Sequence, residues 1–370
     1  MLPLAGPPTA HPWLAPTTSV AVIGGADSLS HTADGGTTWQ PGTVAAAGFT
    51  GRLFALQFID ASTGWTVGQS GEILKTVDGG AGWAAEASGT TKDLHDVQFV
   101  DANDGWAVGG SNDWLNGLSG SVVLHTTDGG ATWLPQTSGI AGLSYDLAGV
   151  AFVDAQRGWA AGGRDWGDAG FGVVMHTSDG GLSWTQQLLP VGDAVLNAIA
   201  FDGDGLHGWA VGEVMGDAGV NTAVIVATTD GGATWTRQLS YLPPIVGNSS
   251  DAALNGVACI DAKHAVAVGY GNGYTEIFRT VNGGAKWTRL TKPASWGLDL
   301  SDVVFTDATH GWAIGSTTVI ATTDGGATWT RQSVGADTAL NAVSFVNRTH
   351  GWVAGGGADI LTTTTGGKTP

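Results

Sequence analysis

Seven stretches of the chain place an Asp or Asn beside two glycines and a few residues before a tryptophan, in the form TxDGGxxW. A carboxylate next to Gly-Gly can hold a metal ion or align backbone N–H groups around an anion, so this pattern is the first candidate for chemistry. The tryptophans recur every 42 to 52 residues. The acidic or amide position is occupied by Asp34, Asp78, Asp128, Asp179, Asp230, Asn282 and Asp324.

A second motif, GWAVG and its variants, alternates with the first. Ahead of most copies lies an apolar alternation with a period of two, as in LHDVQFVD and LSDVVFTD, which is typical of a β-strand. One unit therefore predicts four short strands, A to D, with the DGG motif at the turn between strands C and D. The second motif occupies residues 64–68, 105–109, 158–162, 208–212, 265–269, 311–315 and 351–355.

Four short strands in every unit are typical of β-propeller blades, which stack radially because one blade cannot bury both of its faces. We therefore predict an all-β fold, a single β-propeller domain over residues 1–370 with four-stranded antiparallel blades. The repeat count gives eight blades, and seven is the alternative. The predicted units are 10–42, 50–86, 93–136, 145–187, 194–238, 252–290, 299–332 and 338–370.

This arrangement favours a structural role for the seven DGG motifs. Residues on different blades cannot converge on one ligand. At a turn between strands, the Asp can accept hydrogen bonds from backbone amides, the glycines permit positive φ, and the Trp buries apolar surface between sheets. Asn282 keeps the acceptor without the charge. We therefore predict that these positions fasten the blades, and we predict no catalytic residue and no metal site.

The other residues with catalytic or metal-binding side chains follow the repeat as well. Asp96 and Asp302 fall in strand A, nearest the channel, but in non-adjacent blades, whereas two carboxylates that flank a scissile bond must lie within roughly 5 to 10 Å. Residues 202–205, DGDG, resemble the start of a calcium loop without its remaining ligands, so we predict a tight turn. The histidines predict packing rather than ligation. They are His31, His125 and His176 in strand C, and His207, His310 and His350 before strand B.

Composition excludes several classes of function. The net charge of −18 would repel a nucleic acid, so no nucleic-acid partner is predicted. The single Cys259 allows neither an intrachain disulfide framework nor a cysteine-based zinc cluster. No apolar run reaches the roughly 18 residues that cross a bilayer, and the first residues do not resemble a signal peptide. No cofactor is predicted.

The TxDGGxxW element is similar to the Asp-box, or BNR repeat, of sialidases, xyloglucan-cleaving propellers and sortilin-type receptors. Its combination with FVDANDGWAVG (99–109) and FTDATHGWAIG (305–315) more closely resembles the propellers of photosystem II assembly factors and their relatives. The resemblance covers nearly the whole chain. It implies the fold, because both motifs are scaffold elements and one fold hosts unrelated activities. It also implies an extracytoplasmic location, whether secreted, periplasmic or on the cell surface.

Several aromatic residues are not required by the repeat and point to a binding face. The loops between strands B and C, and between strand D and the next strand A, emerge together around the channel mouth. Loops that a rigid scaffold positions often carry binding residues, and a Trp beside Asp and Asn suits a sugar ring or a peptide anchor. These side chains could equally plug their own loops. The candidates are Asn112, Asp113, Trp114, Asp165, Trp166, Tyr241, Tyr274 and Trp296.

The sequence therefore predicts a non-catalytic binding or scaffold module that recognises a glycan or a protein partner through its loop-rich face. The alternative is a glycoside-active enzyme, an Asp-dependent hydrolase, on the same propeller scaffold.

Overall fold

The structure is a computed structural model of the 370-residue chain. It describes residues 29–31, 40–44, 52–111, 120–136, 139, 145–166, 169–192, 194–216, 220–243, 251–290, 299–316, 318–332, 340–348, 351–355 and 361–363.

Six complete blades follow one another along these residues, and each is a four-stranded antiparallel sheet. Blade 1 is β3 (Leu53–Phe58), β4 (Gly64–Gly68), β5 (Ile73–Thr76) and β6 (Gly82–Glu86). Blade 2 is β7 (Asp93–Phe99), β8 (Gly105–Ser111), β9 (Gly120–Thr126) and β10 (Leu134–Pro135). Blade 3 is β11 (Asp146–Phe152), β12 (Gly158–Trp166), β13 (Ala169–Thr177) and β14 (Thr185–Gln187).

The next three blades have the same order of strands. Blade 4 is β15 (Ala194–Phe201), β16 (Gly208–Val214), β17 (Thr222–Thr228) and β18 (Thr236–Tyr241). Blade 5 is β19 (Ala252–Cys259), β20 (Ala265–Gly271), β21 (Tyr274–Thr280) and β22 (Thr288–Arg289). Blade 6 is β23 (Asp302–Phe305), β24 (Gly311–Gly315), β25 (Thr318–Thr322) and β26 (Thr330–Gln332).

The predicted count of eight blades, with seven as the alternative, is wrong, because the described strands at the two ends of the chain do not build further four-stranded sheets. Near the N-terminus, β1 (Leu29–His31) and β2 (Gln40–Val44) form a hairpin. β2 then pairs with β6 in parallel, so this hairpin extends blade 1. At the other end, β27 (Leu340–Phe345), β28 (Gly351–Gly355) and β29 (Leu361–Thr363) form a three-stranded sheet, called here the terminal sheet.

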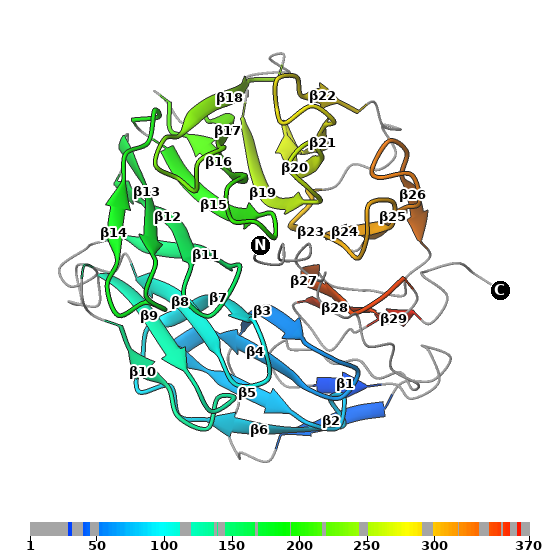
Figure 1. The fold of residues 1–370 in the computed structure, drawn as a ribbon. Coiled ribbons are helices and arrows are strands. Elements are labelled where there is room, and N and C mark those ends of the chain that lie inside the picture. The colour runs from blue at the N-terminus through cyan, green and yellow to red at the C-terminus, as the bar shows by residue number, and fades with distance from the viewer. Residues whose placement is uncertain are drawn as a thin grey trace, which may run out of the picture.

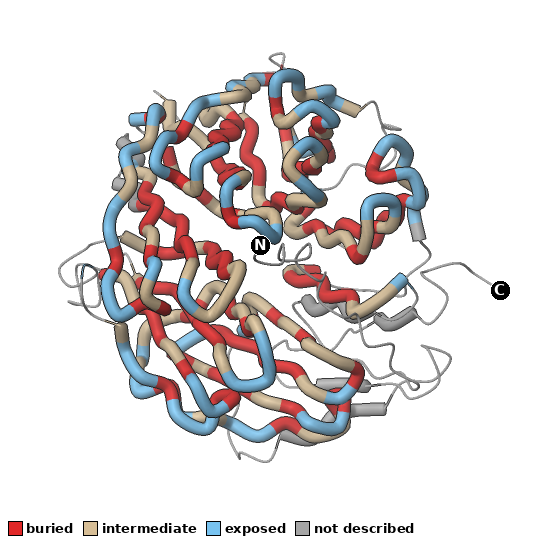
Figure 2. Tube along the Cα trace, in the orientation of Figure 1, coloured by how far each residue is buried: buried red, intermediate tan, exposed pale blue. Residues whose placement is uncertain are grey.

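The sheets are arranged as a ring, with the first strand of each blade innermost (Figure 1). The terminal sheet lies between blade 6 and blade 1 and closes this ring. Val343 N–H donates to Asp302 Oδ2 of blade 6 (3.1 Å), and Phe58 N–H of blade 1 donates to Ser344 Oγ (3.4 Å). Buried residues lie mainly along the inner and middle strands, and exposed residues lie mainly on turns and outer strands (Figure 2).

The hydrophobic core is divided into clusters that join neighbouring blades. The GW tryptophan of one blade stacks on the phenylalanine that ends the inner strand of the next, as Trp106 does on Phe152 with ring centroids 3.6 Å apart. That phenylalanine meets the DGG-motif tryptophan of its own blade edge-on, as Phe152 does with Trp184 at 5.9 Å. Trp106 Nε1 also donates to the carbonyl of Gly180 in the next DGG turn (3.0 Å). The joint between blades 2 and 3 therefore combines apolar burial with a hydrogen bond, and the Trp–Phe stack recurs for Trp65 on Phe99, Trp159 on Phe201 and Trp312 on Phe345.

Two close approaches explain the glycines of the GWAVG motif. Gly158 lies opposite Phe152 in the neighbouring strand, and a Cβ there would sit 2.4 Å from the ring. At Gly162 a Cβ would sit 2.0 Å from the backbone oxygen of Asp146. Blade 5 departs from the motif consistently, since Ala265 replaces the first glycine where Cys259 replaces the phenylalanine.

Antiparallel order gives the ring two different faces. The turns from the first to the second strand and the DGG turns share one face, called here the turn face. The other connections emerge on the opposite face, called here the loop face. In the part of the chain that the structure describes, no helix has the length and apolar character to cross a membrane.

Candidate binding face

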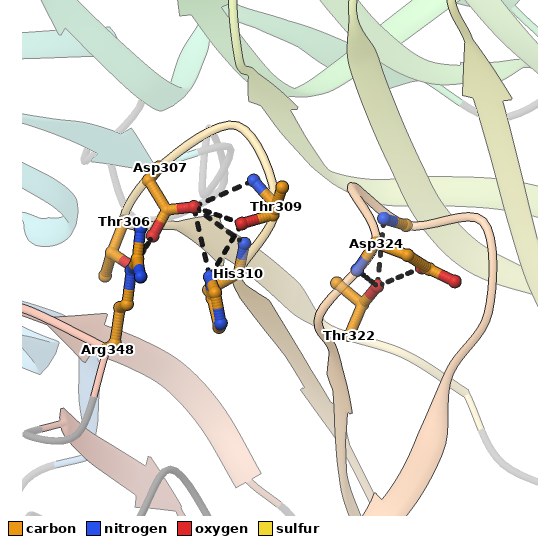
Figure 3. A network of polar contacts seen from close by, with 8 residues as sticks. Thr306, Asp307, Thr309, His310, Thr322, Asp324 and Arg348 are labelled. Carbon is orange, nitrogen blue, oxygen red and sulfur yellow. Dashed lines mark hydrogen bonds and ion pairs between the residues drawn. The ribbon is translucent and has the colours of Figure 1, made fainter.

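The described DGG turns share one hydrogen-bonded arrangement, centred on a threonine. In blade 2, Thr126 Oγ1 donates to Asp128 Oδ1 (2.8 Å) and accepts from Gly130 N–H (2.8 Å). The two oxygens of Asp128 accept in addition from the N–H and the hydroxyl of Thr132, at 2.8 and 2.7 Å. Figure 3 shows the equivalent contacts of Thr322 and Asp324. The threonine contacts recur at Asp78, Asp179, Asp230 and Asn282, and Asp34 lies outside the described residues.

Burial distinguishes the threonine from the acid. Thr126 is 1% exposed, whereas Asp128 is exposed at the turn face. Hydrogen bonds from the side chain and backbone of Thr132 lower the pKa of Asp128. Sequence reasoning ranked the acid first and missed the threonine, although threonine opens all seven copies of the motif.

The predicted binding residues divide into three groups. Asn112, Asp113, Trp114 and Trp296 lie outside the described residues. Asp165 and Trp166 end β12, where they pair with Gly170 and Ala169 of β13, so this hairpin continues to its tip on the loop face. Tyr241 and Tyr274 lie on adjacent blades, at the end of β18 and the start of β21.

The two tyrosines have different surroundings. Tyr241 packs against blade 5, with its ring 5.2 Å from the Arg289 guanidinium and its hydroxyl donating to Glu276 Oε1 (3.4 Å). Glu276 is 1% exposed and accepts from Nε and Nη2 of Arg289, both at 2.5 Å. Tyr274, by contrast, is 49% exposed. Tyr241 therefore packs at the interface between blades 4 and 5, whereas the ring of Tyr274 is exposed to solvent.

Sequence reasoning also missed a set of carboxylates on the loop face, called here the acidic rim. Blades 2 to 6 contribute one each, from the start of the inner strand or the end of the second strand. All five are at least partly exposed. Three directly precede the leucine of their inner strand, a repeat visible in the sequence. The acidic rim consists of Asp93, Asp146, Glu213, Asp251 and Asp299.

Two of the rim carboxylates accept hydrogen bonds from neighbouring side chains, and the rim charges shift the pKa of a nearby tyrosine. Asp251 accepts from the hydroxyl of Tyr270 (3.4 Å), and Glu213 accepts from Asn221 Nδ2 (2.7 Å). Burial, followed by the charges of Glu213, Asp251 and Asp299, raises the pKa of Tyr270. These three carboxylates, from blades 4 to 6, therefore act on one phenol as negative charges.

The rim continues between blades 2 and 3. His95 Nε2 lies 3.1 Å from Asp146 Oδ1. Burial disfavours the charged imidazole, but the contact with Asp146 and the charges of Asp93 and Asp96 outweigh burial and raise the pKa of His95. Arg52 stands at the corresponding place in blade 1, so the acidic character belongs to blades 2 to 6.

Asp96 and Asp302 lie deeper, on the inner strands, and bind backbone groups. Asp96 accepts from Val97 N–H (2.8 Å) and from Val150 N–H of the next blade (2.9 Å). Asp302 bridges Val303 and Val343 in the same way, at 2.7 and 3.1 Å. Burial raises the pKa of Asp96 to about 7 and of Asp302 to about 6, and the charge of Asp302 adds to the shift of Asp96. Both carboxylates therefore tie neighbouring inner strands together.

One group of described side chains has the donor types of a metal site. Asp202, Asp204 and His207 lie on the turn face of blade 4, and one ligand atom from each falls within 4.8 Å of the others. The sequence predicted a tight turn here, and the turn is present, with Gly205 at a φ of +71°.

Comparison with known proteins places these features in a family. The family described as photosynthesis system II assembly factor YCF48 matches residues 47–135, 79–191 and 286–370, which together cover more than half of the chain. No curated protein matches the sequence.

The chain is also similar to solved structures. YCF48 from Cyanidioschyzon merolae is 20% identical, with a TM-score of 0.59 over 84% of this chain and 95% of that chain. A structure described as YCF48 bound to D1 peptide is 19% identical, with a TM-score of 0.58 over 85% and 93%. A GH74 xyloglucanase from Xanthomonas campestris is 14% identical, with a TM-score of 0.56 over 91% of this chain and 57% of that chain. At these identities the likeness shows the fold alone.

Proposed function

Because the chain belongs to the photosynthesis system II assembly factor YCF48 family, we propose that it is a non-catalytic scaffold that binds a protein partner through its loop face. The bound segment is a polypeptide that carries Lys or Arg. A member of the same family is described in complex with a peptide, which supports a polypeptide as the class of ligand.

The acidic rim is the observation that supports this proposal most directly. Five carboxylates from five successive blades, 2 to 6, stand at strand ends on the loop face, on a chain with a net charge of −18. A mouth lined by one sign of charge attracts the opposite sign and speeds encounter. Because the rim residues stand at strand ends, the fold positions them before any partner arrives.

The exposed ring of Tyr274 supplies an apolar contact near this rim. It follows the Asn272–Gly273 turn, and Asn272 exchanges backbone and side-chain hydrogen bonds with Asp251 of the rim. An aromatic ring beside a charged groove is a common anchor for a bound peptide. Recognition by Asp165, Trp166 and the candidates outside the described residues stays a prediction.

The other predicted partners and activities have weaker support. A glycan partner depends mainly on tryptophans whose side chains the structure does not describe. An Asp-dependent hydrolase would need free carboxylates, whereas Asp96 and Asp302 accept backbone N–H groups. The extracytoplasmic location also stays a prediction, which cell fractionation would test.

Peptide binding tests the proposed function. Fluorescence anisotropy would compare three labelled peptides of equal length, rich in Lys and Arg, neutral, or rich in Asp and Glu. We expect only the first to bind, and more weakly at high salt because screening shortens the reach of the rim charges. The triple change Asp93→Asn, Glu213→Gln, Asp299→Asn should weaken binding by about tenfold, which corresponds to about 1.4 kcal/mol.

A matched control removes the same charge from the other face. The triple change Asp60→Asn, Asp101→Asn, Asp128→Asn affects turns of blades 1 and 2 and should leave binding within about twofold of the wild type, since long-range charge alone gives little affinity. Equal weakening by both triple variants would contradict a site at the rim. Glycan-array signal without any peptide binding would favour the glycan partner instead.

A further inference from the structure

The turn between β15 and β16 differs from its five counterparts in the other complete blades. Each counterpart has one Asp whose Oδ1 accepts the N–H groups two and three residues later, as Asp261 does from Lys263 (2.8 Å) and His264 (2.9 Å). The counterparts are centred on Asp60, Asp101, Asp154, Asp261 and Asp307. In blade 4, Asp204 takes this place and accepts from Leu206 N–H (2.6 Å). The blade 4 turn is one residue longer and carries a second acid, Asp202, directly after Phe201. The blade 2 turn also has a second acid, Asp104, but this residue lies 3.6 Å from His125 of β9 and not beside a histidine of its own turn.

The side chain of Asp202 lies close to that of His207, the histidine of the same turn. His207 Nδ1 lies 3.2 Å from Asp202 Oδ2 and 3.4 Å from Asp204 Oδ2. The Nδ1 atom is buried, and neither contact is aligned as a hydrogen bond. The side chain of Asp202 is only 10% exposed. One oxygen of each carboxylate lies within 4.8 Å of the other, and a proton or a cation between them would relieve the repulsion of two like charges at this range.

In the equivalent turns of blades 3 and 6, the carboxylate pairs with an arginine. In blade 6, Asp307 binds His310 and also Arg348 Nε (2.8 Å), so an arginine supplies the positive charge (Figure 3). In blade 3, Arg157 does so for Asp154 (2.7 Å). Arg157 also extends toward blade 4, where its Nη1 donates to the backbone oxygen of Asp204 (2.9 Å). Arg157 therefore contacts the backbone of the blade 4 turn and pairs with the carboxylate of its own blade.

We propose that Asp202, Asp204 and His207 form a binding site for a divalent transition-metal ion such as Zn²⁺. Asp202 Oδ2, Asp204 Oδ2 and His207 Nδ1 are the ligand atoms. Two carboxylate oxygens with one imidazole suit this class, whereas Ca²⁺ and Mg²⁺ prefer oxygen ligands throughout. Cys259 is a neighbour outside the ligand set, because its Sγ is not among the atoms that lie within 4.8 Å of one another and instead donates to the carbonyl of Asp261 (3.8 Å).

A metal ion here would cross-link the end of β15 to the start of β16. Asp202 directly follows Phe201, which takes part in the joint with Trp159 of blade 3 (ring centroids 3.7 Å apart). A ligand that binds the folded chain and not the unfolded chain stabilises the fold by mass action. The site lies on the turn face and acts independently of a partner on the loop face.

Metal titration of the full chain tests this site. After treatment with EDTA and removal of the chelator, Zn²⁺ would be titrated by calorimetry, and Co²⁺ would serve as a spectroscopic probe. We expect one equivalent to bind at least tenfold more tightly than the remaining acidic surface, with a rise in Tm. Bound Co²⁺ should give d–d absorption that Zn²⁺ abolishes, a readout that needs no variant.

Blade 5 supplies matched control variants. Asp202→Asn and His207→Gln should each remove the tight equivalent, whereas Asp261→Asn and His264→Gln make the same chemical changes at a one-carboxylate turn and should retain it. If all five proteins bind alike, or if the wild type shows no saturable equivalent, the proposed site is wrong.

Discussion

At the scale of single residues, the DGG turn depends on a buried hydroxyl more than on its exposed acid. Thr126 Oγ1 is in contact with Asp128 Oδ1 and with the N–H groups of Asp128 and Gly130. The contact between the Thr126 hydroxyl and Gly130 N–H is buried, so losing the hydroxyl would leave that donor unsatisfied. The exposed carboxylate, by contrast, can exchange a lost contact for water.

Thr126→Val therefore tests whether the buried hydroxyl stabilises the DGG turn. Valine keeps the shape but removes the hydroxyl, and we expect the free energy of unfolding to fall by about 1–3 kcal/mol, the cost of an unsatisfied buried polar group. Chemical denaturation would measure it. Thr127→Val is the control, because Thr127 is exposed and its loss should cost less than about 0.5 kcal/mol. Equal effects of the two changes would contradict a special role for the buried hydroxyl.

Sequence reasoning assigned roles to the Asp, the glycines and the Trp of the turn but not to the threonine, because the sequence does not show which side chain is buried. The repeat marked the Asp, the glycines and the threonine equally, and exposure depends on how the turn packs against the next blade. The acidic rim was missed for a related reason. Asp93, Asp146 and Asp299 are visible as an acid before a leucine. Glu213 and Asp251 reach the same face through strand pairing within their own blades: Glu213 pairs with Val195, and Asp251 directly precedes Ala252, which pairs with Gly271.

Among the strands, the second strand of a blade needs glycine where the backbone of the inner strand comes close to it. A Cβ at Gly162 would meet the backbone of the inner strand at Asp146, at the irregularity between Leu147 and Gly149. A backbone atom cannot rotate away as a side chain can. The glycine is therefore a packing requirement of the pairing between β11 and β12.

Gly162→Ala should accordingly destabilise the protein. Overpacking of this kind costs typically 1–3 kcal/mol, and we expect a value at or above the upper end, since backbone must shift. Gly192→Ala is the control, because no atom lies within 4 Å of a Cβ at that position. Thermal unfolding of both variants would measure the difference. Similar melting temperatures would contradict the close approach.

The strands and turns were predictable because alternation and glycine-rich turns are local signals, whereas the number of blades was not. Counting motifs counts second and third strands, but a blade also needs its first and fourth. β1 and β2 do not form a separate blade, because β2 pairs with β6 through Thr43–Gly82 and Val44–Trp83. Such pairing joins residues about 40 apart and is invisible to a count of motifs.

At the scale of the whole molecule, the ring is tied together by polar side chains of its inner strands. Gln57 exchanges two hydrogen bonds with the backbone of Phe99, and Asn255 donates to the carbonyl of Leu300 (2.8 Å). Asp96 and Asp302 also join neighbouring inner strands, but their carboxylates only accept hydrogen bonds, from backbone N–H groups. Two acids thus stand on the inner wall of a strongly acidic ring, where ionisation is unfavourable.

The raised pKa of Asp96 makes stability depend on pH in a definite direction. The pKa is about 7 in the folded chain against a usual value of 3.8, so the folded state holds a proton that the unfolded state releases. Between these two values, raising the pH favours unfolding by at most about 1.4 kcal/mol per unit, and above pH 7 this contribution is constant. Asp302 and His95, the titratable groups that face Asp96, influence this pKa and are unchanged in the variant below.

Asp96→Asn cannot release that proton, so the comparison with wild type isolates the effect. We expect the variant to gain stability relative to wild type as the pH rises from 4.5 to 7.5, by up to about 3 kcal/mol. Denaturant unfolding across this range would measure the difference, and Asp101→Asn, on the exposed turn face, controls for net charge. Curves for Asp96→Asn and wild type that stay parallel throughout would show that Asp96 is ionised in the folded ring at acidic pH. Its two backbone contacts would then outweigh burial, and the inner wall would be a site of fixed negative charge.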